Sequence, residues 1–248
     1  MIKIKSSLEI KLMEKAGKIV GETHKYLKEY LKPGITTKEL DSLAYDFIIK
    51  KGATPSFKGY EGFPASICTS INEEVVHGIP SNRKLKNGDI ISIDIGACYK
   101  GYHGDSAWTY PIGEISLENK ALLEHTEQSL YEGLKVIKDG AYVGDIGNAI
   151  SKYIKKYKYG VVKELVGHGV GKEIHEEPDV PNYGKPKTGP LLKEGMVIAV
   201  EPMINLGTSK IYIKEDGWTI VTADNLPSAH FEHTVLVTKE GIKILTKG

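Results

Sequence analysis

The spacing of apolar residues predicts two helices at the start of the chain. Ser6 and Thr36 each stand three residues before a glutamate, which is the capping-box pattern of a helix N-terminus. We expect the first helix to end before Pro33 and the second before Gly52, because proline and glycine stop helices. The apolar stripe of the first helix consists of Leu8, Leu12, Ile19, Leu27 and Leu31.

A turn-rich segment and a hairpin should follow. Residues 53–88 contain many glycines and prolines around a short apolar stretch at 66–71. Residues 90–111 alternate β-branched and aromatic residues around Lys100-Gly101, which predicts a hairpin with a two-residue turn. The turn-rich segment can therefore supply loops beside a β-sheet.

The second half of the chain repeats the order of helices and strands. Helices are predicted at 116–139 and 145–156, followed by a Gly/His/Pro-rich segment at 167–190. Strands are then predicted at 196–204, 211–213, 218–222 and 230–238. A helix pair followed by antiparallel strands, occurring twice, predicts an α+β fold with a pseudo-twofold plan, in a single domain over residues 1–248.

Two aspartates interrupt the hairpin, where a lone buried carboxylate would cost several kcal/mol. A turn at Lys100-Gly101 places Asp94 opposite Ala107 and makes Asp105 its diagonal neighbour on the same face. Two converging carboxylates repel each other, and a divalent cation removes that repulsion. An isolated pair has a simpler explanation, in which Asp105 caps a turn and Asp94 ends a strand. A metal site therefore needs further ligands.

Further candidate ligands occur later in the chain. His168 and His175 lie in GHGVGKEIHEEP, Glu201 in VIAVEPMI and Glu232 in HFEHTVLVT. Each alone could be an ordinary solvated side chain, but both glutamates interrupt apolar strands, as the aspartates do. Four carboxylates and an imidazole suit two divalent ions held about 3.5–4 Å apart, a pair that can generate hydroxide at neutral pH. The pattern therefore predicts hydrolase chemistry.

Composition excludes several other classes of protein. The chain of 248 residues has 33 Lys and Arg against 32 Asp and Glu, with no long run of one sign, so we expect neither a DNA nor a membrane partner. No apolar run reaches the ~18 residues of a membrane span, and the N-terminus lacks the pattern of a signal peptide. Cys68 and Cys98 form neither a disulfide framework nor a zinc motif, which favours the cytoplasm.

At these residues the sequence resembles a type I methionine aminopeptidase, over nearly the whole chain. The segment ICTSINEEVVHGIP is similar to the one that carries a further active-site histidine in that family, here His77. The family has the pita-bread fold and removes the initiator methionine from new polypeptides. The resemblance implies five metal ligands, which are Asp94, Asp105, His168, Glu201 and Glu232.

The resemblance also implies a role for each group in the site. Asp94, with the bridging Asp105 and Glu232, would hold one ion, and the bridging pair with His168 and Glu201 would hold the other. Glu201 would also transfer the proton of the bridging water. The two remaining histidines would stay off the metals, with His175 at the scissile carbonyl and His77 on the substrate backbone. Without the resemblance, His77 reads more simply as a turn residue before Gly78-Ile79-Pro80.

The methionine pocket of the family is matched less closely. Tyr60, Phe63, Cys68 and Trp218 stand at positions that resemble pocket-lining ones, although the aromatic residues could equally belong to a core. Phe57 stands where some relatives have cysteine, and Ile174 where some have phenylalanine, so the size of the pocket is open. Asn72 and Ser228 match positions near a monovalent cation.

The resemblance implies a bacterial-type short form: a cytoplasmic monomer that acts on the N-terminal methionine of nascent polypeptides and contacts the ribosome transiently. The metals would be two of Mn, Fe, Co or Zn, which the sequence does not distinguish. Two alternatives remain open. Prolidases and Xaa-Pro aminopeptidases share the ligands but carry a large preceding domain, for which this chain has no room. Non-enzymatic pita-bread binding proteins lose ligands, whereas all five are present here.

Overall fold

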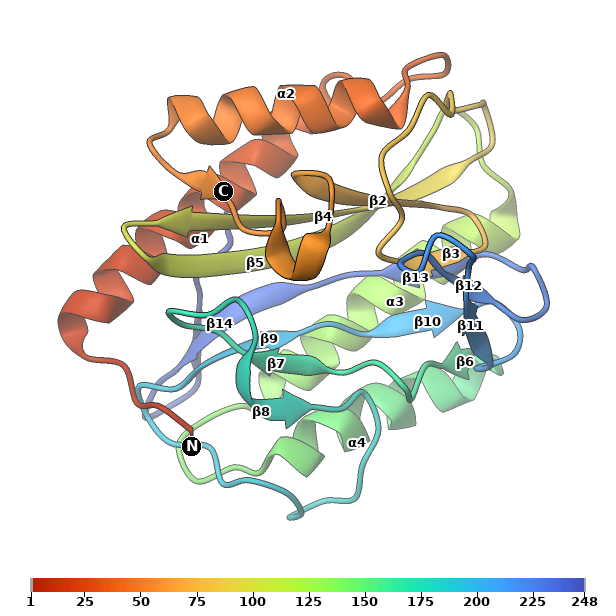
Figure 1. Cartoon of the computed structure of the whole chain (residues 1–248). Coiled ribbons are helices and arrows are strands. Elements are labelled where there is room, and N and C mark those ends of the chain that lie inside the picture. The colour runs from red at the N-terminus through yellow and green to blue at the C-terminus, as the bar shows by residue number, and fades with distance from the viewer. Residues whose placement is uncertain (1, 248) are drawn as a thin grey trace.

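Two helix pairs enclose a set of antiparallel strands in the computed structural model, which describes residues 2–247 (Figure 1). α1 (Ser7–Lys28) and α2 (Thr37–Lys50) cover the strands of the first half, and α3 (Leu117–Lys135) and α4 (Val143–Ile154) cover those of the second. The predicted α+β class and the repeated order of helices and strands are confirmed. The expected domain, residues 1–248, includes Met1 and Gly248, which lie outside the described residues.

The strands within residues 2–247 form four sheets, and every pairing in them is antiparallel. The first sheet contains β1 (Thr54–Pro55), β4 (Ile90–Tyr99), β2 (Ile67–Ile71) and β5 (Tyr102–Pro111). The second contains β13 (Ser228–His230), β10 (Met203–Asn205) and β6 (Gly160–Val161). The third contains β11 (Ile211–Ile213), β12 (Ile220–Thr222) and β3 (Glu74–Val76). The fourth contains β15 (Ile242–Ile244), β14 (His233–Val237), β9 (Val197–Val200), β7 (Gly167–Gly169) and β8 (Glu176–Val180). Short 3-10 helices are η1 (Tyr60–Gly62) and η2 (Lys155–Tyr157).

The hairpin of β4 and β5 has the predicted register. Lys100 and Gly101 have φ values of 51° and 81°, as a type I′ turn requires. Asp94 pairs with Ala107, and Asp105 pairs with Gly96, so the two aspartates are diagonal neighbours on one face. A slip of one residue along β5 would turn Asp105 to the face opposite Asp94, so the convergence of the two carboxylates depends on this register.

The first helix begins as predicted and buries part of the predicted apolar stripe, since Ile19 and Leu27 are fully buried. The capping boxes at Ser6 and Thr36 are both present. Leu8, however, is 69% exposed, and α1 ends at Lys28 rather than near Pro33. The buried face also includes Gly17, which lies so close to β5 that a Cβ on Gly104 would be 2.6 Å from its backbone nitrogen. Small residues therefore let α1 approach β5 more closely than a leucine stripe would allow.

The two long strands predicted for the second half are each interrupted. The stretch 196–204 breaks at Glu201 and Pro202, and the stretch 230–238 breaks at Phe231 and Glu232. Pro202 has no N–H to donate to a ladder, and the N–H of Glu232 donates instead to the carbonyl of Ala107 in β5, at 2.8 Å. The prediction that these glutamates lie within strands was wrong. Both lie where the chain passes from one sheet to another.

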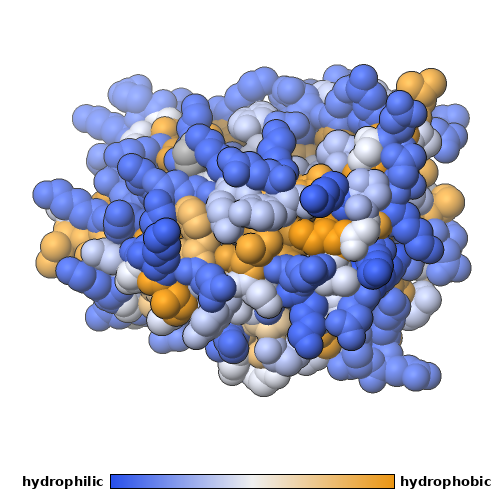
Figure 2. All heavy atoms as spheres, turned by 90° about the horizontal axis from the view of Figure 1, so that it is seen from above, coloured by the Kyte–Doolittle hydropathy of each residue, from blue (hydrophilic) through white to orange (hydrophobic). Residues whose placement is uncertain are grey.

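Apolar clusters on both sides of the strands hold the layers together. One cluster joins α1 and α2 to β2 and β4, and another joins α3 and α4 to β9, β13 and β14. Seen from above, the surface is mostly hydrophilic, with apolar side chains between the polar ones (Figure 2). Within residues 2–247, no helix is both long and apolar enough to cross a bilayer.

Candidate metal centre

The five predicted metal ligands converge from both halves of the fold. Asp94 and Asp105 come from the hairpin, His168 from β7, and Glu201 and Glu232 from the two strand breaks. One ligand atom from each of Asp94, Asp105 and Glu232 lies within 4.8 Å of the other two, and the same holds for His168, Glu201 and Glu232. Glu232 belongs to both groups, so the arrangement can hold two neighbouring cations.

The aspartates and Glu232 are strongly destabilised as anions by their surroundings. Burial, together with the charge of Glu201, raises the pKa of Asp94 to about 7, although His230 partly offsets this. Burial and the neighbouring carboxylates raise the pKa of Asp105 and of Glu232 well above their ordinary values. Groups with these properties become ionised when a cation binds beside them.

Unsatisfied oxygen atoms provide a direct test of whether a cation fits. Within the described chain, Oδ1 of Asp94, Oδ1 of Asp105 and Oε1 of Glu232 are buried and have no hydrogen-bond partner. Buried polar atoms are normally paired, so these three indicate a missing positive partner. The donor set of hard oxygens with one imidazole suits divalent cations, and the residues present therefore fit such ions.

His168 is oriented as a metal ligand would be. Its Nδ1 lies 3.0 Å from the carbonyl oxygen of Gly169, and only a protonated Nδ1 can donate to that oxygen. In the neutral ring with its proton on Nδ1, Nε2 has the lone pair that a metal ligand needs, and it faces two acids, at 3.4 Å from Oε1 of Glu201 and 3.8 Å from Oδ2 of Asp105. A cation placed between these three atoms would be coordinated by all of them.

Glu201 differs from the other acids, because imidazoles surround it. Burial opposes its ionisation, but His230 and His168 outweigh that effect and lower the pKa of Glu201. Nε2 of His230 lies 3.2 Å from Oε2 of Glu201, without the geometry of a hydrogen bond. His230 was not predicted from the sequence. Its spacing of two residues from Glu232 could have revealed it, because alternate residues of an extended chain face the same side.

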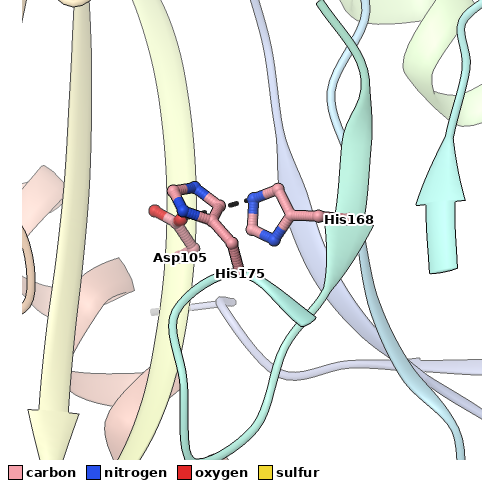
Figure 3. A group of neighbouring side chains, drawn as sticks. All are labelled: Asp105, His168 and His175. Atoms are coloured by element: carbon pink, nitrogen blue, oxygen red, sulfur yellow. Dashed lines mark ion pairs between the residues drawn. The ribbon is translucent and has the colours of Figure 1, made fainter. Parts of the chain in front are cut away.

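His175 lies beside these ligands, at the end of the loop that precedes β8. Figure 3 shows the rings of His168 and His175 beside the carboxylate of Asp105. Nδ1 of His175 is 2.9 Å from the hydroxyl of Tyr60, and its ring is 4.3 Å from that of His168. Burial, with a contribution from His168, lowers the pKa of His175 to about 4. One nitrogen of His175 also lies within 4.8 Å of ligand atoms of Asp105 and His168.

A buried ion pair, which was not predicted from the sequence, holds the loop that carries His175. Nζ of Lys5 lies 2.6 Å from Oε2 of Glu176, and the two side chains are 5% and 6% exposed. The other carboxylate oxygen of Glu176 accepts from the backbone N–H of Lys172. Lys5 lies far from this loop in the sequence, so no local pattern reveals the pair.

A cavity of about 380 Å³ connects the acids to an aromatic wall. Tyr60, Phe63, Cys68 and Trp218 all line it, and Phe63 and Trp218 meet edge to face at 5.1 Å. Phe57 and Ile174 pack in the same apolar cluster. Burial and the charge of nearby acids raise the pKa of the Cys68 thiol, which therefore stays neutral.

His77 and several apolar residues complete the cavity. His77 follows β3 at a φ of 60°, a conformation that few non-glycine residues adopt. Burial lowers its pKa, although Glu201 opposes this shift. Leu165, Val166 and Met203 also line the cavity and were not predicted. These three residues add apolar surface to the cavity beside the acids.

The residues matched to a monovalent-cation site are neighbours. The backbone N–H of Ser228 donates to the carbonyl of Asn72 at 2.8 Å, and Asn72 has a φ of 55°. The Ser228 hydroxyl donates to Asn205. A cation at this place stays a prediction.

Comparison with known proteins agrees with this geometry. The sequence model of Metallopeptidase family M24 matches residues 11–239. Methionine aminopeptidase 1 of Bacillus subtilis is 56% identical over 247 residues, covering 100% of both chains. The crystal structure of methionine aminopeptidase from Rickettsia prowazekii superposes with a TM-score of 0.98 at 44% identity, covering 99% of this chain and 100% of that one. Prolidase from Pyrococcus furiosus superposes with a TM-score of 0.80 at 29% identity, covering 99% of this chain and 65% of that one. The predicted pita-bread fold is confirmed.

Proposed function

This chain belongs to metallopeptidase family M24, and from that premise we propose that it is a methionine aminopeptidase, which removes the initiator methionine from new polypeptides. The observation that carries the proposal is the convergence of five metal-binding side chains at one end of an aromatic-walled cavity. The acids supply the hydrolytic centre, and the wall supplies a site for an apolar side chain of moderate size.

The metal centre takes two divalent ions in this proposal. Asp94, Asp105 and Glu232 would hold one, and Asp105, His168, Glu201 and Glu232 would hold the other. Bound ions of this kind polarise a carbonyl and lower the pKa of water to near neutrality. The ions are Mn, Fe, Co or Zn, because oxygen-rich sites accept all four. A monovalent cation at Asn72 and Ser228 belongs to the same proposal.

Glu201 is the proton carrier of the reaction. Its pKa lies below its ordinary value, so at neutral pH the carboxylate is ready to accept a proton from the attacking water. The same group can then deliver this proton to the leaving amine.

His175 and His77 act on the substrate rather than on the metals. Burial raises the pKa of the Tyr60 hydroxyl, which therefore keeps its proton and can donate it to Nδ1 of His175. The neutral imidazole then carries its own proton on Nε2 and presents a donor to the scissile carbonyl. His77 lines the same cavity and hydrogen-bonds the substrate backbone.

The methionine side chain of the substrate packs against the wall of the cavity, which is made by Tyr60, Phe63, Cys68 and Trp218. A polarisable thioether packs well against aromatic rings and a neutral thiol.

The partner is the N-terminus of a nascent polypeptide. The protein meets it as a cytoplasmic monomer in transient contact with the ribosome. The likeness to prolidase keeps Xaa-Pro cleavage as the alternative activity.

Peptide hydrolysis by the metal-loaded protein tests this proposal. We expect cleavage of Met-Ala-Ser, no cleavage of Xaa-Pro peptides, and loss of activity after chelation. Glu201→Gln should lower kcat by about 10²–10⁴-fold while the fold is kept, because one proton transfer is removed. Cleavage of Xaa-Pro peptides alone would replace the proposed substrate. Absence of both metal binding and peptidase activity would indicate a binding protein instead.

A second variant tests the role of His77. His77→Ala should lower kcat/KM by about 10–100-fold through the lost hydrogen bond, with metal affinity unchanged. Calorimetric titration with Mn²⁺ measures the affinity, and initial rates on Met-Ala-Ser measure the turnover. A variant that simply loses its metal would show that His77 is a ligand.

A further inference from the structure

A second cavity, outside the metal centre, is lined by lysines. It has a volume of about 840 Å³ and lies between α4, β6 and the segment around Gly184. The charged residues that line it are all basic, and no Asp or Glu is among them. We call this cavity the lysine groove and define it by Lys152, Lys155, Lys163, Lys185, Tyr159 and Tyr183.

The four lysines are exposed and carry uncompensated charge. Among residues 2–247, none of them forms an ion pair with a carboxylate. The nearest acid in the sequence, Glu164, does not line the groove, and its carboxylate accepts from the backbone N–H of Lys163. Residues 146–163 contain five lysines and neither Asp nor Glu. The groove therefore concentrates positive charge on a chain whose formal net charge is only +1.

Aromatic and hydrogen-bonding groups accompany the lysines. Tyr183 is 41% exposed, and the ammonium group of Lys163 lies 5.8 Å from the centre of its ring. Tyr159 lies in the wall, where its hydroxyl is 3.2 Å from Nδ1 of His125. Asn148 and Ser151 also line the groove. An exposed ring beside several cations is the combination that binds single-stranded nucleic acids, because phosphates meet the cations and a base stacks on the ring.

We propose that the lysine groove binds a single-stranded segment of RNA. RNA carries a negative charge on every nucleotide and exposes base faces, so it uses both features of the groove. An acidic peptide would use the lysines but would gain little from the exposed ring of Tyr183. Three of these lysines come from the acid-free stretch 146–163, and Lys185 on a separate segment completes the groove.

The lysine groove lies near the metal centre. The functional role that we give to RNA binding in the groove rests on the proposed function. Leu165 and Val166, shortly after Lys163, line the cavity of the metal centre. Asn182, which precedes Tyr183, donates to the carbonyl of Glu201 at 3.0 Å. An RNA segment in the groove would hold the enzyme beside RNA while its metal centre accepts the N-terminus of a new polypeptide.

Binding of labelled RNA to the metal-loaded protein tests the proposal. The probe is a single-stranded oligouridylate of about 20 nucleotides, followed by fluorescence anisotropy between roughly 50 and 200 mM salt. The test variant combines Lys152→Gln, Lys155→Gln and Lys163→Gln. The matched control combines Lys11→Gln, Lys25→Gln and Lys50→Gln, which are exposed lysines of α1 and α2.

We expect the groove variant to bind RNA at least about tenfold more weakly than the unmodified protein. The slope of the logarithm of the binding constant against the logarithm of salt concentration should become shallower by about 2, because three lysines are replaced and each phosphate contact contributes about 0.7. The control variant should bind within about twofold of the unmodified protein. Both variants should hydrolyse Met-Ala-Ser normally, because these lysines lie outside the metal centre.

A second pair of variants tests stacking. Tyr183→Ala should weaken RNA binding at least about fivefold, and Tyr183→Phe should leave it unchanged, because the ring and not the hydroxyl stacks on a base. The proposal is overturned if the protein does not bind RNA at low salt, or if both lysine variants bind equally. It is also overturned if oligoglutamate or anionic vesicles bind the groove more tightly than RNA. RNA binding without peptidase activity would instead refute the proposed function and leave the groove assignment standing.

Discussion

The two pairs of acids in the metal centre are held in place by different means. Asp94 and Asp105 lie on strands of one hairpin, where ten consecutive residue pairs, Ile90–Pro111 through Tyr99–Tyr102, fix their register. Glu201 and Glu232 lie in breaks between strands. The backbone of Glu232 bonds to β5 in the other half of the fold, through its N–H to Ala107. Local pairing thus sets the register of the aspartate pair, to which the Thr234 hydroxyl of β14 adds bonds with the backbone of Asp105, whereas the glutamate pair depends on contacts between distant segments.

The acids also differ in the charge that surrounds them. Burial and like charges raise the pKa of Asp94, Asp105 and Glu232, whereas nearby imidazoles lower the pKa of Glu201 against the effect of its burial. Bound cations would therefore favour the ionised form of three of the four acids. Glu201 can be ionised without them, as a proton acceptor must be.

The largest effect is expected from replacing a bridging acid. Asp105→Asn should lower kcat/KM by at least about 10³-fold, which corresponds to ~4 kcal/mol of lost transition-state stabilisation. The chelator-treated variant should nevertheless be more stable than the chelator-treated parent, by more than about 1 kcal/mol at neutral pH, because a buried acid with a raised pKa has been removed. Rates on Met-Ala-Ser and urea unfolding measure the two quantities.

Glu201→Gln provides the comparison for that experiment. It should also abolish most activity, but it should not stabilise the chelator-treated protein, because the pKa of Glu201 is lowered in the folded state. If the two variants changed the free energy of unfolding equally, the electrostatic difference between the two acids would be refuted.

The pH dependence of stability is expected to show the next largest effect. The pKa of Asp94 is raised to about 7 in the folded protein, from an ordinary value of 3.8. Folding therefore favours its protonated form, and this contribution is fully present below about pH 4 and is lost as the pH rises through 7. Between these values, Asp94 should reduce the unfolding free energy of chelator-treated protein by up to about 4 kcal/mol.

The difference between the parent and Asp94→Asn isolates this contribution, since other titrating groups cancel. Urea unfolding of both proteins after chelation, from about pH 4.5 to 7.5, should show Asp94→Asn gaining relative stability as the pH rises. Saturation with Mn²⁺ should remove the decline in the parent, because the bound ions favour the ionised carboxylate. A constant difference at all pH values would mean that Asp94 is not destabilised by burial.

The sequence predicted the aspartate pair more completely than the glutamate pair. A two-residue turn at Lys100-Gly101 fixes which residues of the hairpin face each other, so counting from the turn placed both aspartates. The stretch around Glu201 reads as one continuous apolar strand, and what divides it is Pro202 and the change of sheet that follows. The contact of His230 with Glu201 also joins distant segments, namely the end of β13 and the break after β9, and only the spacing of His230 from Glu232 indicates it locally. Local sequence patterns predict pairing between neighbouring strands, but they carry no information on contacts between the two halves of the fold.

The smallest effect tests whether the hairpin turn alone positions the aspartate pair. Gly101→Ala should destabilise the protein by about 1–2 kcal/mol, because alanine at a φ of 81° is strained. Gly52→Ala, at a φ of 77° after α2 and equally without neighbours within 4 Å of a new Cβ, should cost the same. Only Gly101→Ala should also weaken Mn²⁺ binding, by a few-fold in calorimetric titration, since only that turn sets the register of metal ligands. Equal metal affinity in both variants would show that the ladder beyond the turn, rather than the turn itself, holds Asp94 and Asp105 together.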